Sequence, residues 1–258
     1  MQTIWQTEFG EGPLVACAIH DGHAVRPEIA ECLGLNETRR LYEEDPYTAA
    51  WTIVAPTRIV ARRSRFEVDL NRPREKAVYL DPADAWGLEI WACRPSPKIV
   101  ERSLEAYDDF YAHLRLLLER LVARHGRVVV FDLHSYNHLR DGAGSAVADP
   151  AQNPEINLGT GTMDRRRWAP VVDRWLADAR DCDYFGRRLD VRENVRFYGG
   201  HLPGWIHANF PESACALAIE VKKFFMDEWT GALDAHQHEA IGRVLERAAR
   251  GVADELEN

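Results

Sequence analysis

The sequence predicts an α/β fold in which a mostly parallel sheet is covered by helices on both sides. Residues 128–131 are four apolar residues in a row, three of them β-branched, which is typical of a strand buried on both faces. Residues 214–219 form a second buried strand of this kind. Residues 103–125 form the clearest amphipathic helix, with apolar side chains recurring every three or four positions. Because strands and helices alternate along the chain, crossover helices on both faces of the sheet are expected.

The other elements follow from local patterns. Residues 14–19 and 57–61 predict strands, and Asn36 is an N-cap candidate for a helix that runs towards Asp45. Gly126 ends the long helix directly before the central strand. The remaining helices are expected to start near Pro27 and to span residues 166–182 and 233–256. A strand is expected to begin in 65–72, a short strand at 156–159 and an extended segment over 190–197. The expected loops are 82–97, anchored by Trp86 and Trp91, an active-site loop or lid over 142–157, and a Gly/Pro loop over 198–211.

Composition restricts the class of protein. The 258 residues are 46% hydrophobic, which suits a single α/β domain spanning residues 1–258. A net charge of −9 disfavours binding to nucleic acid or to an anionic membrane. No apolar run approaches the roughly 20 residues of a membrane span, and no signal peptide is visible. The five cysteines contain no CxxC pair, so neither disulfides nor a cysteine-metal site is expected. We expect a soluble cytoplasmic protein, and the sequence carries no signal for its oligomeric state.

The central predicted strand ends on polar residues that suit a metal site. Asp132 and His134 are two positions apart, so their side chains share one face of the strand. Ligands of open α/β sheets bind at the carboxyl ends of the strands. His134 is therefore a candidate metal ligand, with Asp132 beside it as ligand or orienting group. The equally weighted alternative is a core histidine satisfied by a neighbour.

Two further groups of candidate ligands lie in the N-terminal part of the chain. His20 and His23 follow the first strand in an HxxH turn, which can place two imidazoles near one ion. Residues 43–45, Glu-Glu-Asp, cluster where a helix is expected to end, and a helix C-terminus disfavours carboxylates. The cluster therefore needs a cation, either a metal or the arginines within residues 62–65. A solvated acidic helix end is the alternative.

A group of polar residues after position 64 suits the binding of an anion. Arg65 and Arg72 can hold carboxylates in bidentate pairs, Asn71 adds an amide donor, and Asp69 is placed to orient an arginine. A surface network of salt bridges is the alternative interpretation.

Glu220 closes the apolar run at 214–219, and a carboxylate there is costly unless it is paired or used. Burial raises the pKa of such a carboxyl into the range of a general base. The adjacent Lys222 and Lys223 are the alternative explanation, as ion-pair partners.

Several of these motifs together resemble the N-formylglutamate amidohydrolase family. HDGH, EEDPYT, SRFEVDLNRP, FDLHS and IEVKKFFMDEWTG occur in this order between about residues 14 and 231. This family is similar to the zinc carboxypeptidases, aspartoacylase and succinylglutamate desuccinylase. The resemblance implies a phosphorylase/hydrolase-like three-layer αβα sandwich with a mostly parallel mixed sheet. It also implies one zinc ion and a small-molecule substrate, an acidic N-acyl amino acid such as N-formylglutamate.

The resemblance also implies a role for each candidate residue. His20 and His134 match the two histidine ligands of the zinc ion. The third ligand is a carboxylate in these enzymes. In the carboxypeptidase and aspartoacylase relatives it occupies the position where this chain has His23. Asp45 is therefore the preferred third ligand, and Glu44 and His23 are the next candidates. Arg65, Asn71 and Arg72 match residues that bind the substrate carboxylate and the oxyanion, and Glu220 matches the general base. Gly199 and Gly200 resemble a glycine turn at the border of the pocket, whereas the HLPGW segment that follows has no match.

Two rival functions remain on the sequence alone. A zinc carboxypeptidase or deacylase acting on another N-acyl amino acid or peptide uses the same residues. Only a panel of N-formyl, acetyl, succinyl and peptide substrates separates that enzyme from an N-formylglutamate amidohydrolase. A protein that binds acidic ligands without catalysis is the alternative from a different class, and it would hold no zinc and gain no activity when zinc is added.

Overall fold

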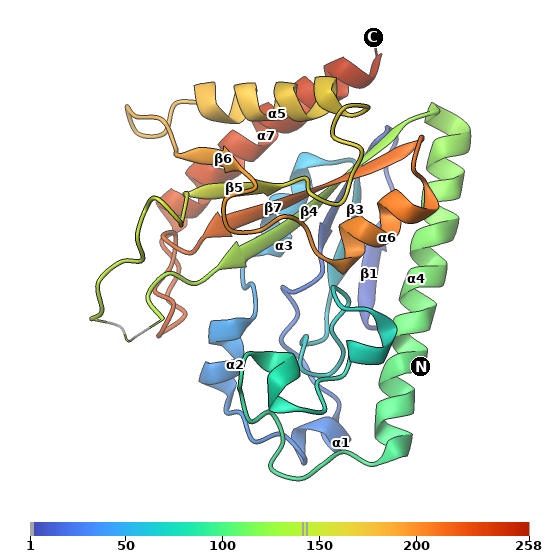
Figure 1. The fold of residues 1–258 in the computed structure, drawn as a ribbon, viewed down its shortest axis with the longest axis vertical. Coiled ribbons are helices and arrows are strands. Elements are labelled where there is room, and N and C mark those ends of the chain that lie inside the picture. The colour runs from blue at the N-terminus through green and yellow to red at the C-terminus, as the bar shows by residue number, and fades with distance from the viewer. Residues whose placement is uncertain (1–2, 141, 143, 258) are drawn as a thin grey trace.

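The computed structural model describes residues 3–140, 142 and 144–257. These residues fold into a seven-stranded sheet with helices on both faces (Figure 1). The strand order is β1-β3-β2-β4-β7-β5-β6. The strands are β1 Trp5–Glu8, β2 Leu14–Ala18, β3 Thr57–Ala61, β4 Val128–Tyr136, β5 Ile156–Gly159, β6 Val191–Glu193 and β7 Ala214–Lys222. The α-helices are α1 Pro27–Ala30, α2 Glu37–Glu43, α3 Thr48–Trp51, α4 Pro97–His125, α5 Ala169–Asp181, α6 His201–Asn209 and α7 Ala235–Glu257; the 3-10 helices are η1 Thr52–Val54, η2 Arg74–Lys76 and η3 Pro82–Ala85.

The sheet is mixed but mostly parallel, as predicted. Strands β3, β2, β4 and β7 run parallel to one another, whereas β1 is antiparallel to β3 and β5 is antiparallel to β7. Every residue of the central strand β4 is buried, which explains the continuous apolar run at its start, residues 128–131. The register places His134 of β4 and Asn157 of β5 on either side of Glu220 in β7. Three polar residues thus lie side by side on neighbouring strands.

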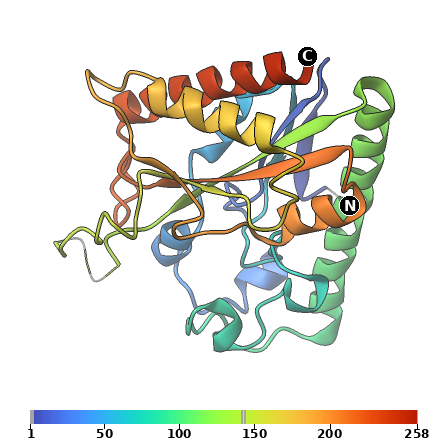
Figure 2. The same cartoon turned by 45° about the horizontal axis from the view of Figure 1, so that its top comes forward.

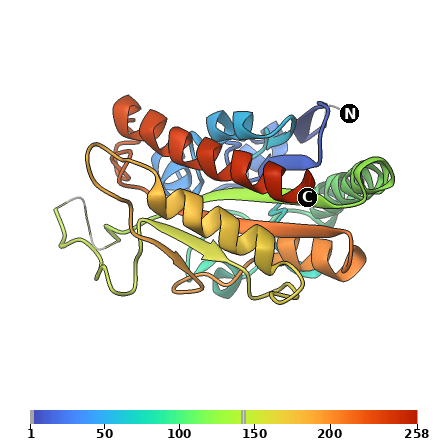
Figure 3. The ribbon, with the colours of Figure 1, turned by 90° about the horizontal axis from the view of Figure 1, so that it is seen from above.

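The helices form an outer layer on each face of the sheet. Helices α5 and α7 pack side by side on one face, where Trp175 and Ile241 are buried against the strands (Figures 2 and 3). Helices α4 and α6 cover the other face, where Phe110 and Leu202 are buried (Figure 1). The predicted α/β fold with helices on both sides is therefore confirmed.

Three local predictions are wrong. Residues 65–72 form turns instead of a strand, because the amide of Asp69 pairs with the carbonyl of Ala77 and not with a neighbouring strand. The expected loop at 198–211 contains helix α6. Its Pro203 lies in the first turn, where a missing N–H costs no helical hydrogen bond. Trp86 is not a packing anchor, since its side chain is 53% exposed.

Other local predictions are confirmed. Asn36 caps α2 by accepting a hydrogen bond from the amide of Arg39 at 2.8 Å. Trp91 packs against a small apolar cluster and donates to the carbonyl of Tyr79 at 2.6 Å. The cysteines are free, and Cys17 and Cys215 are buried as expected. None of the helices that the structure describes is both long and apolar enough to cross a membrane.

The predicted active-site loop at 142–157 is described only in part, because residue 143 lies outside the described residues. Residues 144–155 form turns and irregular backbone, and Ile156 begins β5. No described residue of this segment before β5 lines the cavity discussed below. Its role as a lid stays a prediction.

Candidate metal centre and active site

The candidate site lies at the carboxyl ends of the parallel strands β2, β4 and β7. His20 follows β2 by two residues, while His134 and Glu220 lie within the last three residues of β4 and β7. Parallel strands end at the same edge of a sheet, so side chains that are far apart in the sequence meet there. Both histidines are buried, with 2% and 3% of their surface exposed.

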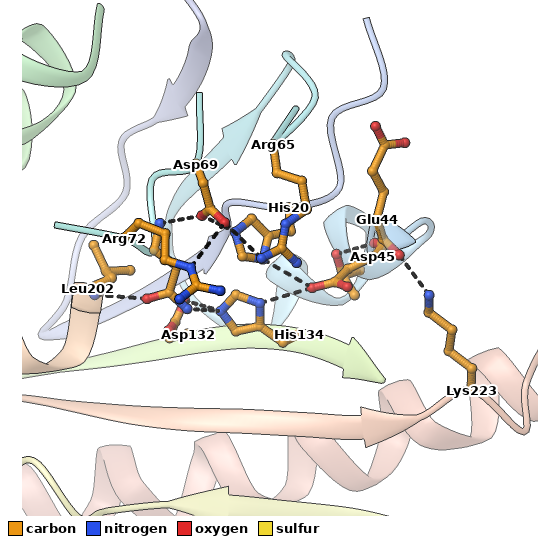
Figure 4. A network of polar contacts seen from close by, with 12 residues as sticks. His20, Glu44, Asp45, Arg65, Asp69, Arg72, Asp132, His134, Leu202 and Lys223 are labelled. Carbon is orange, nitrogen blue, oxygen red and sulfur yellow. Dashed lines mark hydrogen bonds and ion pairs between the residues drawn. The ribbon is translucent and has the colours of Figure 1, made fainter. Parts of the chain in front are cut away.

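Asp45 joins the two histidines and completes a group that can hold a metal ion. Its Oδ2 atom lies 2.9 Å from Nδ1 of His134 and 3.5 Å from Nδ1 of His20 (Figure 4). One donor atom from each of the three residues lies within 4.8 Å of the other two. Asp45 reaches this position because its amide donates to the carbonyl of His20 at 3.0 Å, directly after the end of α2.

A separate carboxylate orients each histidine from behind. Nε2 of His20 lies 2.7 Å from Asp69, and Nε2 of His134 lies 2.9 Å from Asp132. An imidazole that donates from Nε2 to a carboxylate keeps the lone pair of Nδ1 free for a metal. Both rings therefore present the same nitrogen to the same point. Asp69 and Asp132 have no exposed surface, which makes this orientation rigid.

The arrangement fits a divalent metal ion. Nδ1 of His20 is buried and has no hydrogen-bond partner among the described residues, although it points at Asp45 and His134. A buried polar atom without a partner is costly unless a ligand satisfies it. Two imidazole nitrogens and one carboxylate oxygen are a donor set of catalytic metal sites, which keep a further coordination position open.

The charges in the site explain the pKa shifts of its members. Burial raises the pKa of Asp45, but the hydrogen bond that it accepts from His134 and its close contact with His20 outweigh this effect and hold that pKa below its usual range. Burial lowers the pKa of His134, but the charge of Asp132, the close contact with that carboxylate and the hydrogen bond that the imidazole donates to Asp45 raise it well above 6.5. The excess of negative charge that makes the imidazole bind a proton also favours a metal cation.

Glu220 faces this group, and no described residue forms a hydrogen bond or ion pair with its side chain. Burial, together with the charges of Asp45 and Asp132, raises its pKa to about 8, although His134 and Arg65 act in the opposite direction. The predicted alternative, an ion pair with the adjacent lysines, is wrong. Lys222 donates to the carbonyl of Asn153 at 2.7 Å, and Lys223 donates to the carbonyls at positions 42 and 44 at 2.8 and 2.7 Å.

Asp69 organises the predicted anion-binding group. The carboxylate of Asp69 accepts hydrogen bonds from the Arg65 guanidinium and from the backbone amide of Asn71, both at 2.7 Å, as well as from the Tyr79 hydroxyl. The prediction that Asp69 orients an arginine is therefore confirmed. The Asn71 side chain lies 3.5 Å from Nε2 of His134. The side-chain oxygen of Asn71 accepts a hydrogen bond from the backbone amide of Leu202 at 2.9 Å, which ties Asn71 to the start of α6.

Arg72 occupies a more open position than Arg65. Its guanidinium lies 4.0 Å from Asp69 and over the rings of Tyr79 and Trp86, at 5.9 and 5.7 Å from their centroids. The Arg65 guanidinium lies over the same Trp86 ring at 5.0 Å. In Figure 4 both arginines point towards the histidine pair. Trp86, which was predicted as a packing anchor of the 82–97 loop, thus covers two cations of the site.

His23 and Glu44 lie outside the metal-binding group. Nδ1 of His23 is hydrogen-bonded to Glu44, which also accepts from the hydroxyl of Ser64 and lies 3.8 Å from Arg40. Of the three candidates for the third ligand, only Asp45 is brought to the two histidines. Cations from several segments lie near the acidic cluster. Arg39 of α2 pairs with Glu43 at 2.9 Å, and Arg140 lies 3.8 Å from the same carboxylate. Arg65, one of the predicted arginines, interacts electrostatically with Asp45.

A cavity of about 270 Å³ opens onto this group. His20, Asp45, His134 and Glu220 line its floor, and Arg65 and Asn71 line it as predicted. Glu43, from the predicted acidic cluster, also lines the cavity. Sequence reasoning gave no role in the site to the other lining residues, because their role depends on neighbours that only the fold brings to them. These are Trp86, Ser135, Tyr136, Asn137, Arg140, Arg196, Phe197 and Lys223.

Comparisons with known proteins agree with the fold and the motifs. The chain is similar to the crystal structure of an N-formylglutamate amidohydrolase from Ralstonia eutropha JMP134, with a TM-score of 0.78 and 18% identity over 99% of both chains. It is also similar to the structure of a gene product from Agrobacterium tumefaciens, with a TM-score of 0.61 and 17% identity over 98% of this chain and 96% of the other. At these identities the two structures support the fold alone.

No curated protein sequence matches the chain significantly. The model of the N-formylglutamate amidohydrolase family, however, matches residues 12–226. This match covers most of the chain and includes the two histidines, Asp45 and Glu220. The chain therefore belongs to the N-formylglutamate amidohydrolase family.

Proposed function

We propose that this amidohydrolase is zinc-dependent and cleaves the N-formyl amide of an acidic amino acid such as N-formylglutamate. The main support is the convergence of His20, His134 and Asp45 on one point that faces Glu220 across the cavity. The products are formate and the free amino acid.

His20, His134 and Asp45 would hold the zinc ion, since their donor atoms are the only group of this kind found among the described residues. When bound, zinc activates water at neutral pH and polarises an amide carbonyl. Asp69 and Asp132 keep the two imidazoles oriented for this purpose.

Glu220 acts as the general base and then as the general acid. It accepts a proton from the attacking water and delivers that proton to the amide nitrogen as the C–N bond breaks. Its carboxylate lines the cavity, and the lysines next to it in sequence are bonded elsewhere, so it is free to exchange a proton.

Arg65 stabilises the oxyanion that develops on the amide carbonyl. Its guanidinium is buried and held by Asp69 and Tyr79, so it is oriented before the substrate arrives. Asn71 and Arg72 bind a carboxylate of the substrate and thereby position the amide, since both point towards the histidine pair. Arg72 does not line the cavity itself, which makes Asn71 the more direct contact.

The test combines metal analysis with hydrolysis of N-formyl-L-glutamate by the purified protein. We expect one zinc ion per chain and activity that chelation abolishes and zinc restores. Glu220→Gln should lower turnover roughly 100- to 10,000-fold while zinc stays bound. His134→Ala should lose the metal. His23→Ala is the matched control, because it removes a histidine of the same HxxH turn and should retain both zinc and activity. Zinc-independent hydrolysis would contradict the proposal, and so would full activity in Glu220→Gln.

A further inference from the structure

The backbone after β6 is held next to Glu220 by a single buried side chain. Asn157 lies directly opposite Glu220 in the register of β5 and β7 and has no exposed surface. Its side-chain oxygen accepts the amides of Val195, Arg196 and Phe197 at 3.0, 2.9 and 3.3 Å. Its nitrogen donates to the carbonyl of Phe197 at 2.8 Å. Four hydrogen bonds therefore fix this segment at the side of the cavity.

Arg196 is the part of this segment that presents charge to the cavity. Its guanidinium lies 5.5 Å from the centroid of the Tyr136 ring and 5.4 Å from that of Phe197. One of its terminal nitrogens donates to the side chain of Asn153 at 2.7 Å. Two aromatic rings and an amide thus hold the planar cation while part of its donor edge stays available.

Arg196 differs from the other cations that line the cavity. Arg65 pairs with Asp69, Arg140 lies 3.8 Å from Glu43, and Lys223 donates to two backbone carbonyls. Within the described residues no carboxylate lies within ion-pair distance of Arg196. A positioned guanidinium without an acidic partner, at the wall of a small cavity, is suited to bind a ligand carboxylate in a bidentate manner.

The order of the strands places Arg196 and the predicted carboxylate site on opposite sides of the reacting centre. Strand β7, with Glu220, lies between β4 and β5. Arg65 and Asn71 approach from the segment after β3, on the far side of β4. Arg196 approaches from the segment after β6, on the far side of β5. A ligand that reaches across the cavity therefore meets a cationic group at each end.

We propose that Arg196 forms a second carboxylate subsite, which selects N-acyl amino acids with an acidic side chain over neutral ones. This inference rests on the proposed amidohydrolase function. Asn71 and Arg72 bind one carboxylate of the substrate, and Arg196 binds the other. A monocarboxylate fills only the first subsite.

The test compares N-formylglutamate with N-formylglutamine, a neutral substrate of nearly the same shape. In Arg196→Gln, kcat/KM for N-formylglutamate should fall roughly 10- to 100-fold, mainly through KM, because a charge-assisted hydrogen bond is lost. Its kcat/KM for N-formylglutamine should stay unchanged, and Arg196→Lys should recover part of the preference. Arg188→Gln is the matched control, since that exposed arginine pairs with Asp181 at 2.9 Å and does not line the cavity.

A binding measurement keeps the inference testable apart from turnover. Calorimetry on the Glu220→Gln protein should detect the binding of N-formylglutamate. Adding Arg196→Gln should weaken this binding roughly 10- to 100-fold, as it does kcat/KM. Equal loss for both substrates, or loss of the preference in Arg140→Gln instead, would overturn the second subsite and leave the amidohydrolase function standing. If the wild-type protein hydrolyses no N-formyl amino acid, the proposed function fails first and the subsite fails with it.

Discussion

Asp132 offers a way to change metal binding with little effect on folding. It is fully buried, and its only close polar contact is the 2.9 Å approach to Nε2 of His134. Neither of its oxygens has a hydrogen-bond partner among the described residues, so this contact is an ion pair. Asp132→Asn should therefore act on the metal centre through His134 alone.

The expected size of the effect follows from this single contact. Loss of a carboxylate behind a ligating histidine weakens metal binding roughly 10- to 100-fold, which corresponds to about 1.4–2.7 kcal/mol. The free energy of unfolding of the metal-free protein should change by less than about 1 kcal/mol, because removal of a buried charge offsets the lost contact. Zinc competition with a chromophoric chelator measures the first quantity, and denaturant unfolding in chelator measures the second.

Asp69→Asn is the informative comparison. Asp69 also pairs with the buried Arg65 at 2.7 Å and accepts from Asn71 and Tyr79. Its replacement leaves a buried cation without a partner, so stability should fall by about 3 kcal/mol or more in addition to the loss of zinc affinity. If Asp132→Asn binds zinc as tightly as the wild type, the assignment of Asp132 as the group that orients His134 is wrong.

Three further predictions concern other parts of the fold. Burial lowers the pKa of His207 from 6.5 to about 4, so its contribution to stability is present above pH 6.5 and is lost as the pH falls towards 4. This loss is roughly 3 kcal/mol, and denaturant titrations at pH 7 and pH 4.5 should show a smaller loss in His207→Gln. Gly200→Ala places a methyl group 2.3 Å from the side-chain oxygen of Asn71 and should displace that side chain. Because Asn71 is proposed to bind the substrate, we expect KM for N-formylglutamate to rise about tenfold. An unchanged KM would argue against substrate contact by Asn71. Ile241→Ala removes a fully buried side chain of α7 and should cost about 2–5 kcal/mol in unfolding free energy, whereas Leu116→Ala, at a position 67% exposed, should cost less than about 0.5 kcal/mol.

The main elements of the fold were predictable because their signals are local. The first half of β4, residues 128–131, is buried on both faces and is apolar throughout, and the helices α4 and α7 carry apolar side chains at helical spacing. Where the local signal is weak or mixed, the prediction was wrong. Residues 65–72 have the composition of a strand, but the backbone of Asp69 forms hydrogen bonds with Arg72 and Ala77 and pairs with no neighbouring strand.

The candidate site shows the same division. His20, His134 and Glu220 were identified because each follows or ends an apolar strand, a pattern that sequence alone displays. Glu44 and Asp45, however, are neighbours of the same chemical type, and no sequence rule separates them. The extended backbone at Glu44 turns the two side chains in different directions, towards His23 and towards the histidine pair. Asn157 and Arg196 were not singled out, and Trp86 was predicted only as a packing anchor, since the importance of these residues lies in the neighbours they meet.

The sequence by itself determined the α/β architecture, the order of its motifs and the strand ends at which the reactive side chains lie. The tertiary structure was needed to learn that Asp45 joins the two histidines and that no described carboxylate pairs with Arg196 at the cavity wall. The physical reason is that burial and periodicity act on consecutive residues, whereas metal coordination and charge pairing depend on distances between segments far apart in the chain.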